Sequence, residues 1–492
     1  MRRMAIACLV SVALCAAGTA LAQDATTPKV DPARIDDVPV QSGETFEQAL
    51  ARFDNFSWRA FIALNWPSQQ GDANRGLPDT TKKFGDAGAR VWETYKARYE
   101  VFAPGAPKPA NWDQYDGTNP CGGAVTNRTK TLSAFSHFAD FNQAAFALGQ
   151  LANPLIDQNR TYTRYEVRFN REQFDSIFDN QWYIKSKQPT PERPGVFKFG
   201  SIEIKAAWRV LKSGDNVKRE RYYVTKAFVF DPEATTNTGS VACSEQDVAL
   251  VGFHIVIKTP ARPQWIWTTF EHVDNVPPAG TGDAREPDAK DVPVPYTYNS
   301  GNPSQPAMPN PAPKAITKDN YVANPDPMQV VRLRKVLPET MALNRAYWAL
   351  PEIKGTIWQN YMLVMTQWPS VPAVPAGIPP IEYAGAPFPT VPFKQSNLAN
   401  TTMETYAQKK PSGTCMECHQ EVANAQGTDF VAFMLLDVIE PTQRAIASAV
   451  VPRLVPSISA AKKGAARVRA PARTALDDEP AIKALVKMLS SR

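Results

Sequence analysis

The sequence predicts an α+β fold, with a body made of a mainly antiparallel β-sheet and packed helices and a helical segment at the C-terminal end. Several stretches between residues 200 and 272 alternate apolar and polar side chains, which is the period of a half-buried strand. Short turn-like sequences connect these stretches, and such connections are typical of antiparallel sheets. Apolar residues at three-and-four spacing before and after this region indicate helices that pack on the sheet.

The first expected elements are helices. An aromatic-rich apolar set at helical spacing predicts a helix over residues 44–65, with Ser42 or the preceding turn as its cap and Pro67 as its end. A second, shorter helix is expected over 89–102 and a third over 131–153. The residues between these two helices are rich in Pro, Gly and Asn and predict an irregular loop.

The sheet is expected to follow these helices. The alternation is clearest where Ile202 and Ile204 lie on one face of a strand and Glu203 and Lys205 lie on the other. The predicted strands cover residues 162–169, 200–211, 222–230, 248–258 and 264–272.

Residues 276–368 contain many prolines, and these prolines decide which loops and helix ends are predicted there. The Pro-rich residues 276–328 predict a long, irregular loop that belongs to the body. A helix is expected from Pro327 to Trp348 with a break or kink at Pro338, because proline removes a helical hydrogen bond. The apolar residues 355–368 fit a further strand.

The segment Cys415-Met-Glu-Cys418-His419 carries the strongest chemical signal in the chain. Cys-x-x-Cys-His is the attachment signature of c-type haem, in which two thiols add across the haem vinyl groups and the adjacent imidazole binds the iron. A thioredoxin-like redox pair, half of a zinc site and coincidence are the alternatives. A zinc site needs a second ligand pair, which the sequence does not offer, and a Pro-Ser-Gly loop stands where a redox pair would follow a strand. The motif predicts one covalent haem c, attached through Cys415 and Cys418, with His419 as the proximal iron ligand.

The first 22 residues have the pattern of a cleavable secretory signal peptide. Two arginines at the start precede an apolar run, and Ala20-Leu-Ala22 offers small residues at the cleavage positions. Removing Arg2 and Arg3 lowers the net charge from +6 to +4, which is too small to indicate a nucleic-acid or lipid partner. Residues 23–492 contain no further apolar run of about 20 residues, so no stable membrane anchor is expected. We expect export to a bacterial periplasm.

These features divide the chain into three parts. Residues 1–22 form the signal peptide, residues 23–394 form the α+β body with its Pro-rich loop, and residues 395–492 form a helical, cytochrome c-like haem-binding segment. Within this last segment, helices are expected over 421–425, over 430–439 and from Asp477 onward.

Two cysteines remain outside the signal peptide and the haem motif. Cys121 and Cys243 both lie in turn-like sequence, and in an oxidising compartment a disulfide between them is the simplest interpretation. Closing a loop of that length would stabilise the fold by about 4 to 5 kcal/mol in the chain-entropy account. Two buried thiols are the alternative.

The sixth coordination position of the iron determines what such a protein can do. A strong histidine or methionine ligand favours electron transfer, whereas an open position permits chemistry on a small molecule. The candidates for the distal ligand are Met434, Met488, His272 and His254. Glu271 and Asp274 flank His272, as carboxylates do that orient metal-bound histidines.

Four further segments of the sequence carry a resemblance to known proteins. They are Trp58-Arg-Ala-Phe-Ile-Ala-Leu-Asn-Trp66-Pro, Gly200-Ser-Ile-Glu-Ile-Lys-Ala-Ala-Trp208-Arg, Gly252-Phe-His-Ile-Val-Ile-Lys-Thr-Pro260 and Trp265-Ile-Trp-Thr-Thr-Phe-Glu-His-Val-Asp-Asn275. Together with the haem motif, they resemble a group of large bacterial exported proteins of the cytochrome c family, over about residues 56–436. The resemblance implies a covalent haem on a periplasmic body, with Cys415 and Cys418 as attachment sites and His419 as an axial ligand. It implies no distal ligand and no reaction.

The motif predicts a periplasmic c-type cytochrome that transfers electrons to or from a redox partner protein. The body is far larger than a haem needs for its burial. The alternative is therefore a haem-dependent oxidoreductase, peroxidase-like or oxygenase-like, that acts on a small-molecule substrate between the body and the haem. A binding module with a structural or redox-sensing haem is a third hypothesis.

Overall fold

The computed structural model describes residues 26–39, 41, 43–103, 106–115, 130–132, 155–215, 217–230, 243–277, 296–302, 327–369, 398–405, 408, 415–416, 419 and 427–431. The predicted signal peptide lies outside the described residues, as do the helices predicted after His419. Of the helix predicted over 131–153, only the first two residues are described, and they belong to a strand.

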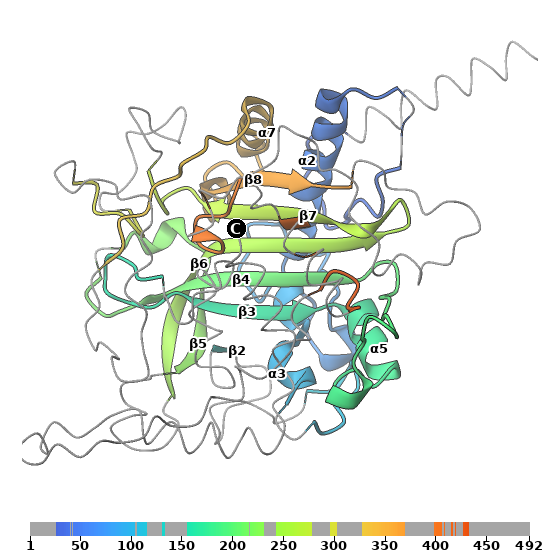
Figure 1. Cartoon of the computed structure of the whole chain (residues 1–492). Helices are drawn as coiled ribbons and strands as arrows, with labels where there is room; N and C mark the ends of the chain where they lie inside the picture. The colour runs from blue at the N-terminus through green and yellow to red at the C-terminus, as the bar shows by residue number, and fades with distance from the viewer. Residues whose placement is uncertain are drawn as a thin grey trace, which may run out of the picture.

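The described residues form an α+β fold around one curled sheet, which confirms the predicted class (Figure 1). Each of the five strands predicted between residues 162 and 272 is present, and the piece over 355–368 contains another. The strands of the sheet are β1 (Lys96–Ala97), β2 (Lys130–Leu132), β3 (Arg164–Phe169), β4 (Ile202–Leu211), β5 (Val224–Phe230), β6 (Cys243–Thr259), β7 (Arg262–His272) and β8 (Tyr361–Gln367).

Strand β6 organises the sheet. One of its edges pairs with β4, whereas the other edge pairs with β5 along Cys243–Ala249 and with β7 along Gly252–Thr259. The sheet therefore divides at the middle of β6 and curls there. Strand β8 continues it beyond β7, and β3 and β1 continue it beyond β4. Among the described strand pairs, the pairing of β2 with β5 is parallel and the others are antiparallel.

The first predicted helix is confirmed. Helix α2 (Phe46–Leu64) begins after Thr45, which forms a reciprocal capping box with Gln48, so Thr45 and not Ser42 is the cap. The remaining helices and 3₁₀ turns are short: η1 (Asp72–Asn74), η2 (Val91–Thr94), α3 (Arg98–Val101), α5 (Arg171–Asp179), η3 (Lys185–Lys187), η4 (Arg219–Arg221), α7 (Pro338–Trp348) and η6 (Ile357–Asn360).

Two helix predictions are wrong in their extent. The helix predicted over 89–102 is divided into η2, the two-residue strand β1 and the single turn α3, because Lys96 and Ala97 pair with the end of β3. The helix predicted from Pro327 begins only at Pro338, which occupies its first turn. Proline has no N–H to offer and a fixed φ, so it starts this helix and does not break it.

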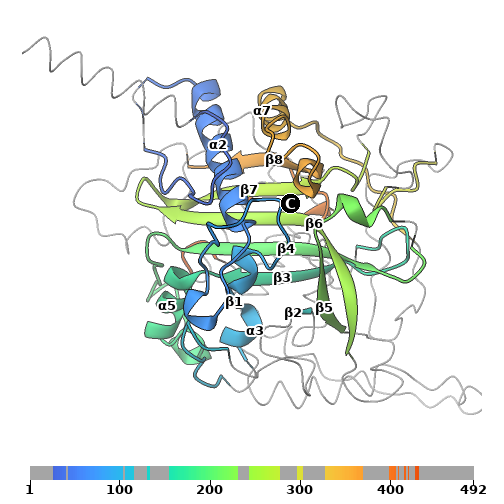
Figure 2. The ribbon, with the colours of Figure 1, turned by 180° about the vertical axis from the view of Figure 1, so that it is seen from behind.

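The two faces of the sheet have different neighbours. Helices α2 and α7 cover one face, where the Trp58 ring stacks on Tyr347 at 4.6 Å and Phe61 contacts both Phe253 and Phe270 (Figure 2). Because side chains alternate along a strand, His254, next to Phe253, points to the opposite face. That opposite face carries the described residues of the predicted haem segment.

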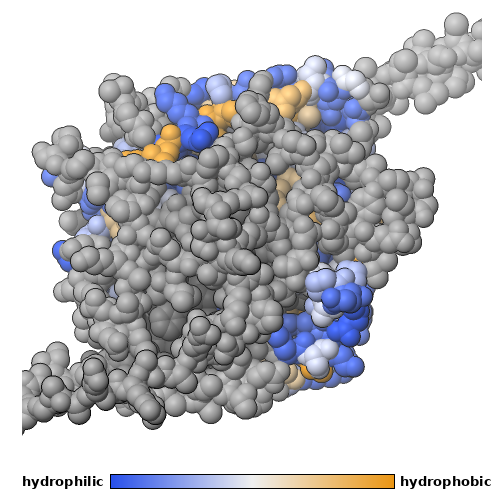
Figure 3. Space-filling view, viewed as in Figure 1, coloured by the Kyte–Doolittle hydropathy of each residue, from blue (hydrophilic) through white to orange (hydrophobic). Residues whose placement is uncertain are grey.

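Hydrophilic side chains lie on several parts of the outer surface among the described residues. Figure 3 shows hydrophilic side chains gathered over α5, whose inward residues include Phe174 and Ile177. Among the described residues, no helix is long and apolar enough to cross a membrane.

Candidate functional site

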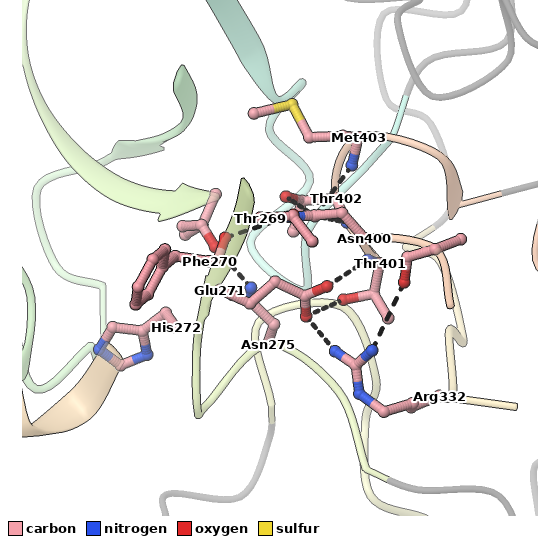
Figure 4. A network of polar contacts seen from close by, with 12 residues as sticks. Thr269, Phe270, Glu271, His272, Asn275, Arg332, Asn400, Thr401, Thr402 and Met403 are labelled. Carbon is pink, nitrogen blue, oxygen red and sulfur yellow. Dashed lines mark hydrogen bonds and ion pairs between the residues drawn. The ribbon is translucent and has the colours of Figure 1, made fainter. Parts of the chain in front are cut away.

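A tight turn at Asn400–Met403 fixes the start of the predicted haem segment on the sheet. The Asn400 side-chain amide donates to Thr269 Oγ1 at 2.7 Å and to the carbonyl of Phe270 at 3.1 Å, both on β7. The Asn400 side-chain oxygen accepts hydrogen bonds from the backbone N–H groups of Thr402 and Met403. One buried asparagine therefore shapes the turn and joins it to the sheet (Figure 4).

Glu271 holds the same turn from the next position of β7. Its fully buried carboxylate accepts from the backbone N–H and the hydroxyl of Thr401, and it forms an ion pair with the buried Arg332 (Figure 4). Sequence analysis assigned Glu271 to the orientation of His272. The structure shows instead that Glu271 bonds Thr401 of the C-terminal segment and not His272, because consecutive residues of a strand point to opposite faces.

The described part of the Cys415–His419 motif lies against β7 and β8. The Met416 N–H donates to Gln367 Oε1 at 3.3 Å, and the Met416 side chain is fully buried in the core. The half-buried Cys415 packs against a small cluster of buried apolar side chains to which Met365 belongs. Cys418 lies outside the described residues.

His419 lies in a defined orientation. Its Nδ1 is 2.6 Å from the carbonyl oxygen of Phe430, and its ring lies 4.3 Å from the ring of Trp267 on β7. A carbonyl can only accept, so Nδ1 carries the proton and Nε2 holds a lone pair. Burial lowers the pKa of His419 to about 4, against the effect of the Phe430 carbonyl, and the imidazole is therefore neutral near pH 7. A neutral imidazole with its Nδ1–H bonded to a backbone carbonyl is the form in which histidine binds metals.

The Phe430 carbonyl is itself held in place by Asp429. The Asp429 carboxylate lies 2.7 Å from Lys258 Nζ on β6 and accepts from the Phe197 N–H, while its backbone carbonyl accepts from Trp265 Nε1. All of these groups are buried. Residues 427–431, which follow His419 in the sequence, are thus fixed to the same sheet.

His254 lies at the centre of the sheet face that carries the motif. In the strand register it is paired with Lys205 on β4 and with Thr269 on β7. Lys205 is the only residue of β4 that is not buried. Between Val248 and Thr259, His254 is the only residue of β6 that is not buried. Lys205 and His254 are thus partly exposed within otherwise buried stretches of β4 and β6.

The electrostatic surroundings of His254 are unusual for a strand interior. Among the described residues its Nε2 is buried and has no hydrogen-bond partner, and the nearest carboxylate oxygen, Glu404 Oε2, is 3.6 Å away. Burial holds the pKa of His254 well below its usual value, and the charges of Lys205 and His419 act in the same direction. Burial also raises the pKa of Glu404 and lowers the pKa of Lys205, with partial compensation by their mutual attraction.

His272 is enclosed in a different environment. Its Nδ1 accepts from the Asp274 N–H at 3.1 Å, so Nε2 carries the proton and donates to the Arg221 carbonyl at 3.0 Å. The ring stacks on Tyr222 at 3.8 Å and is fully buried. It points away from the Glu271 network (Figure 4). Both ring nitrogens of His272 thus have structural partners, and Asp274 acts on it through the backbone.

Three of the other predicted site residues, Cys121, Met434 and Met488, lie outside the described residues. Cys243 is half-buried at the beginning of β6, and the predicted Cys121–Cys243 disulfide stays a prediction.

Several residues of this site were not identified from the sequence. Trp267, Glu404 and the Phe430 carbonyl have no sequence signal that relates them to His419. Lys205 had a weak signal, since it is a charged residue within a strongly apolar strand. Within the described part of the chain, no group of three or more His, Cys, Asp or Glu side chains is arranged to hold a metal ion. No family model, no curated protein and no solved structure matches this chain.

Proposed function

We propose that this protein is a c-type cytochrome that carries one haem, attached covalently through Cys415 and Cys418, with His419 as an axial iron ligand. The observation that supports this most strongly is the orientation of His419. The Phe430 carbonyl binds Nδ1–H and leaves the Nε2 lone pair available. This arrangement is of little use to a thioredoxin-like pair, which needs no oriented imidazole.

The surrounding residues fit a haem. The partly exposed side chains of Lys205 and His254 lie on the side of the sheet that carries Trp267 and the motif. Trp267 supplies an apolar wall, and the buried Nε2 of His254 is a nitrogen donor without a hydrogen-bond partner among the described residues. A bound haem would supply a one-electron redox centre.

We propose electron transfer as the activity, with a redox protein as the partner and the periplasm as the location. The anchoring of the haem segment favours this function. Buried bonds from Asn400, Glu271 and Asp429 hold the chain on both sides of the motif, and a rigid site needs little reorganisation when its charge changes.

A haem-dependent oxidoreductase that acts on a small substrate is the second candidate. The observation in its favour is the acid and base pair beside His254. Glu404 and Lys205 have pKa values displaced toward neutrality, and groups of this kind move protons in haem enzymes. Carbon monoxide distinguishes the two candidates, because it binds reduced iron only where a coordination position is open or weakly held.

The test of haem attachment uses the full chain, expressed with a c-type maturation system. Cys415→Ala combined with Cys418→Ala should abolish the haem that remains on the polypeptide after denaturing electrophoresis. Met416→Leu is the matched control, since it changes the same turn, keeps its buried apolar side chain and leaves both thiols, and it should retain covalent haem. Covalent haem on the double-alanine variant, or none on the wild-type chain, would refute the proposal.

A further inference from the structure

We infer that His254, on the central strand of the sheet, is the second axial ligand of the haem iron. This inference rests on the proposed haem attachment and adds to it the residue that closes the sixth coordination position. The resulting site would have two histidines, one from the C-terminal motif and one from the middle of β6.

The register of the sheet supports this assignment. His254 is paired with Thr269, and Trp267 lies two residues before Thr269 on the same face of β7. The Trp267 ring contacts the His419 ring at 4.3 Å. The two imidazoles therefore belong to the same face of the sheet.

The state of the His254 ring supports the assignment independently. A buried ring nitrogen without a hydrogen bond is destabilising, because it has lost its hydration without a replacement partner. Among the described residues Nε2 has no hydrogen-bond partner, and Glu404 at 3.6 Å is too far to provide one. Iron coordination would satisfy this nitrogen.

The other described candidates are less suitable. Both nitrogens of His272 are occupied by backbone groups. The sulfur of Met365 accepts from the side-chain amide of Gln367 at 3.1 Å.

The experiment measures the spin state of the iron in the matured, haem-loaded full chain. Electron paramagnetic resonance and optical spectra of the wild-type protein should show low-spin iron, and its reduced form should not bind carbon monoxide. His254→Ala should convert the iron to high spin and should allow carbon monoxide to bind fully. Added imidazole should restore the low-spin spectrum of this variant, which a merely structural role of His254 would not produce.

Two further variants keep the test decisive. His272→Gln should remain low spin, because His272 is not a ligand in this assignment. His254→Met replaces the nitrogen donor by a thioether in case the alanine variant does not fold, and it should show the sulfur-to-iron absorption band and a raised reduction potential. A haem-loaded His254→Ala protein that stays low spin without imidazole would overturn the inference but would leave haem attachment intact. Absence of covalent haem from the wild-type chain would instead refute the proposed function itself.

Discussion

Gly252 offers a direct test of how the turn at Asn400–Met403 is held on the sheet. It lies on β6, where it is paired with Glu271 of β7 and Ala207 of β4. A Cβ at this position would lie 2.1 Å from Thr402 Oγ1, whereas ordinary contacts begin near 3.4 Å. The backbone conformation of Gly252 is not in the left-handed region, so the substitution Gly252→Ala tests this single contact.

The expected loss follows from the contacts of Thr402. Its hydroxyl donates to Asn400 Oδ1 at 2.8 Å, and relief of the clash by rotation would break this buried bond. A buried hydrogen bond contributes about 1 kcal/mol, and displacement of the packed turn adds about 1 to 3 kcal/mol. Gly252→Ala should therefore lower the free energy of unfolding by about 2 to 4 kcal/mol.

Denaturation by urea, combined with a double-mutant cycle, measures this loss. Thr402→Ala alone should cost about 1 kcal/mol, because it removes the hydroxyl and its bond. The double variant should be more stable than the sum of the two single losses predicts, since the alanine at 252 then meets no hydroxyl. Equal stability of Gly252→Ala and wild type, or strict additivity in the cycle, would show that the turn does not lie against β6 as described.

Three further predictions concern buried charges. Burial raises the pKa of Asp54 from its ordinary 3.8 to about 7, against hydrogen bonds from Thr340 and Thr366. The folded state thus keeps a proton that the unfolded chain loses near pH 4, so stability should fall between about pH 4 and 7 by at most about 4 kcal/mol. Asp54→Asn should flatten this part of the curve of thermal midpoint against pH, and an unchanged slope would contradict the assignment. Glu271→Ala should cost about 3 to 5 kcal/mol in urea denaturation, because it leaves the Arg332 guanidinium buried without its carboxylate. Adding Arg332→Leu should recover part of that loss, and a larger combined loss would argue against the ion pair. The pKa of Glu166 is lowered, because Lys130 and Arg168 outweigh the effect of its burial. Its contribution should be present above about pH 4 and lost in more acidic solution, so Glu166→Gln should be less sensitive to acid than wild type, and equal acid sensitivity would refute this.

The accuracy of the strand predictions has a simple physical reason. In β4, Ile202 and Ile204 face the core and Lys205 faces the other side, as the alternation of the sequence predicts. A strand of a sheet with two different faces needs a period of two, and this period is visible in a single stretch of sequence. The helix over 46–64 is similarly local, because its apolar residues and its cap lie within the same few turns.

The errors arose where distant residues decide local structure. Residues 89–102 have helical spacing, yet Lys96 and Ala97 pair with β3, which lies far away in sequence. Pro338 was expected to interrupt a helix that in fact begins at it, because the residues before it bond elsewhere. The Val330 N–H, for example, donates to the carbonyl of Tyr298.

The Cys415–His419 motif can be recognised in the sequence, because thiol spacing and the adjacent histidine are local properties, and the haem that it predicts stays a prediction. The surroundings of His254 and His272 could not be told apart in the same way, since both are histidines in apolar strands. Their difference is tertiary. His272 is enclosed by Tyr222 and bonded at both nitrogens, whereas His254 lies on the face of the sheet that carries Trp267 and has a buried nitrogen that lacks a hydrogen bond from any described residue. Only the packing of the C-terminal segment on the sheet brings such distant residues to one place.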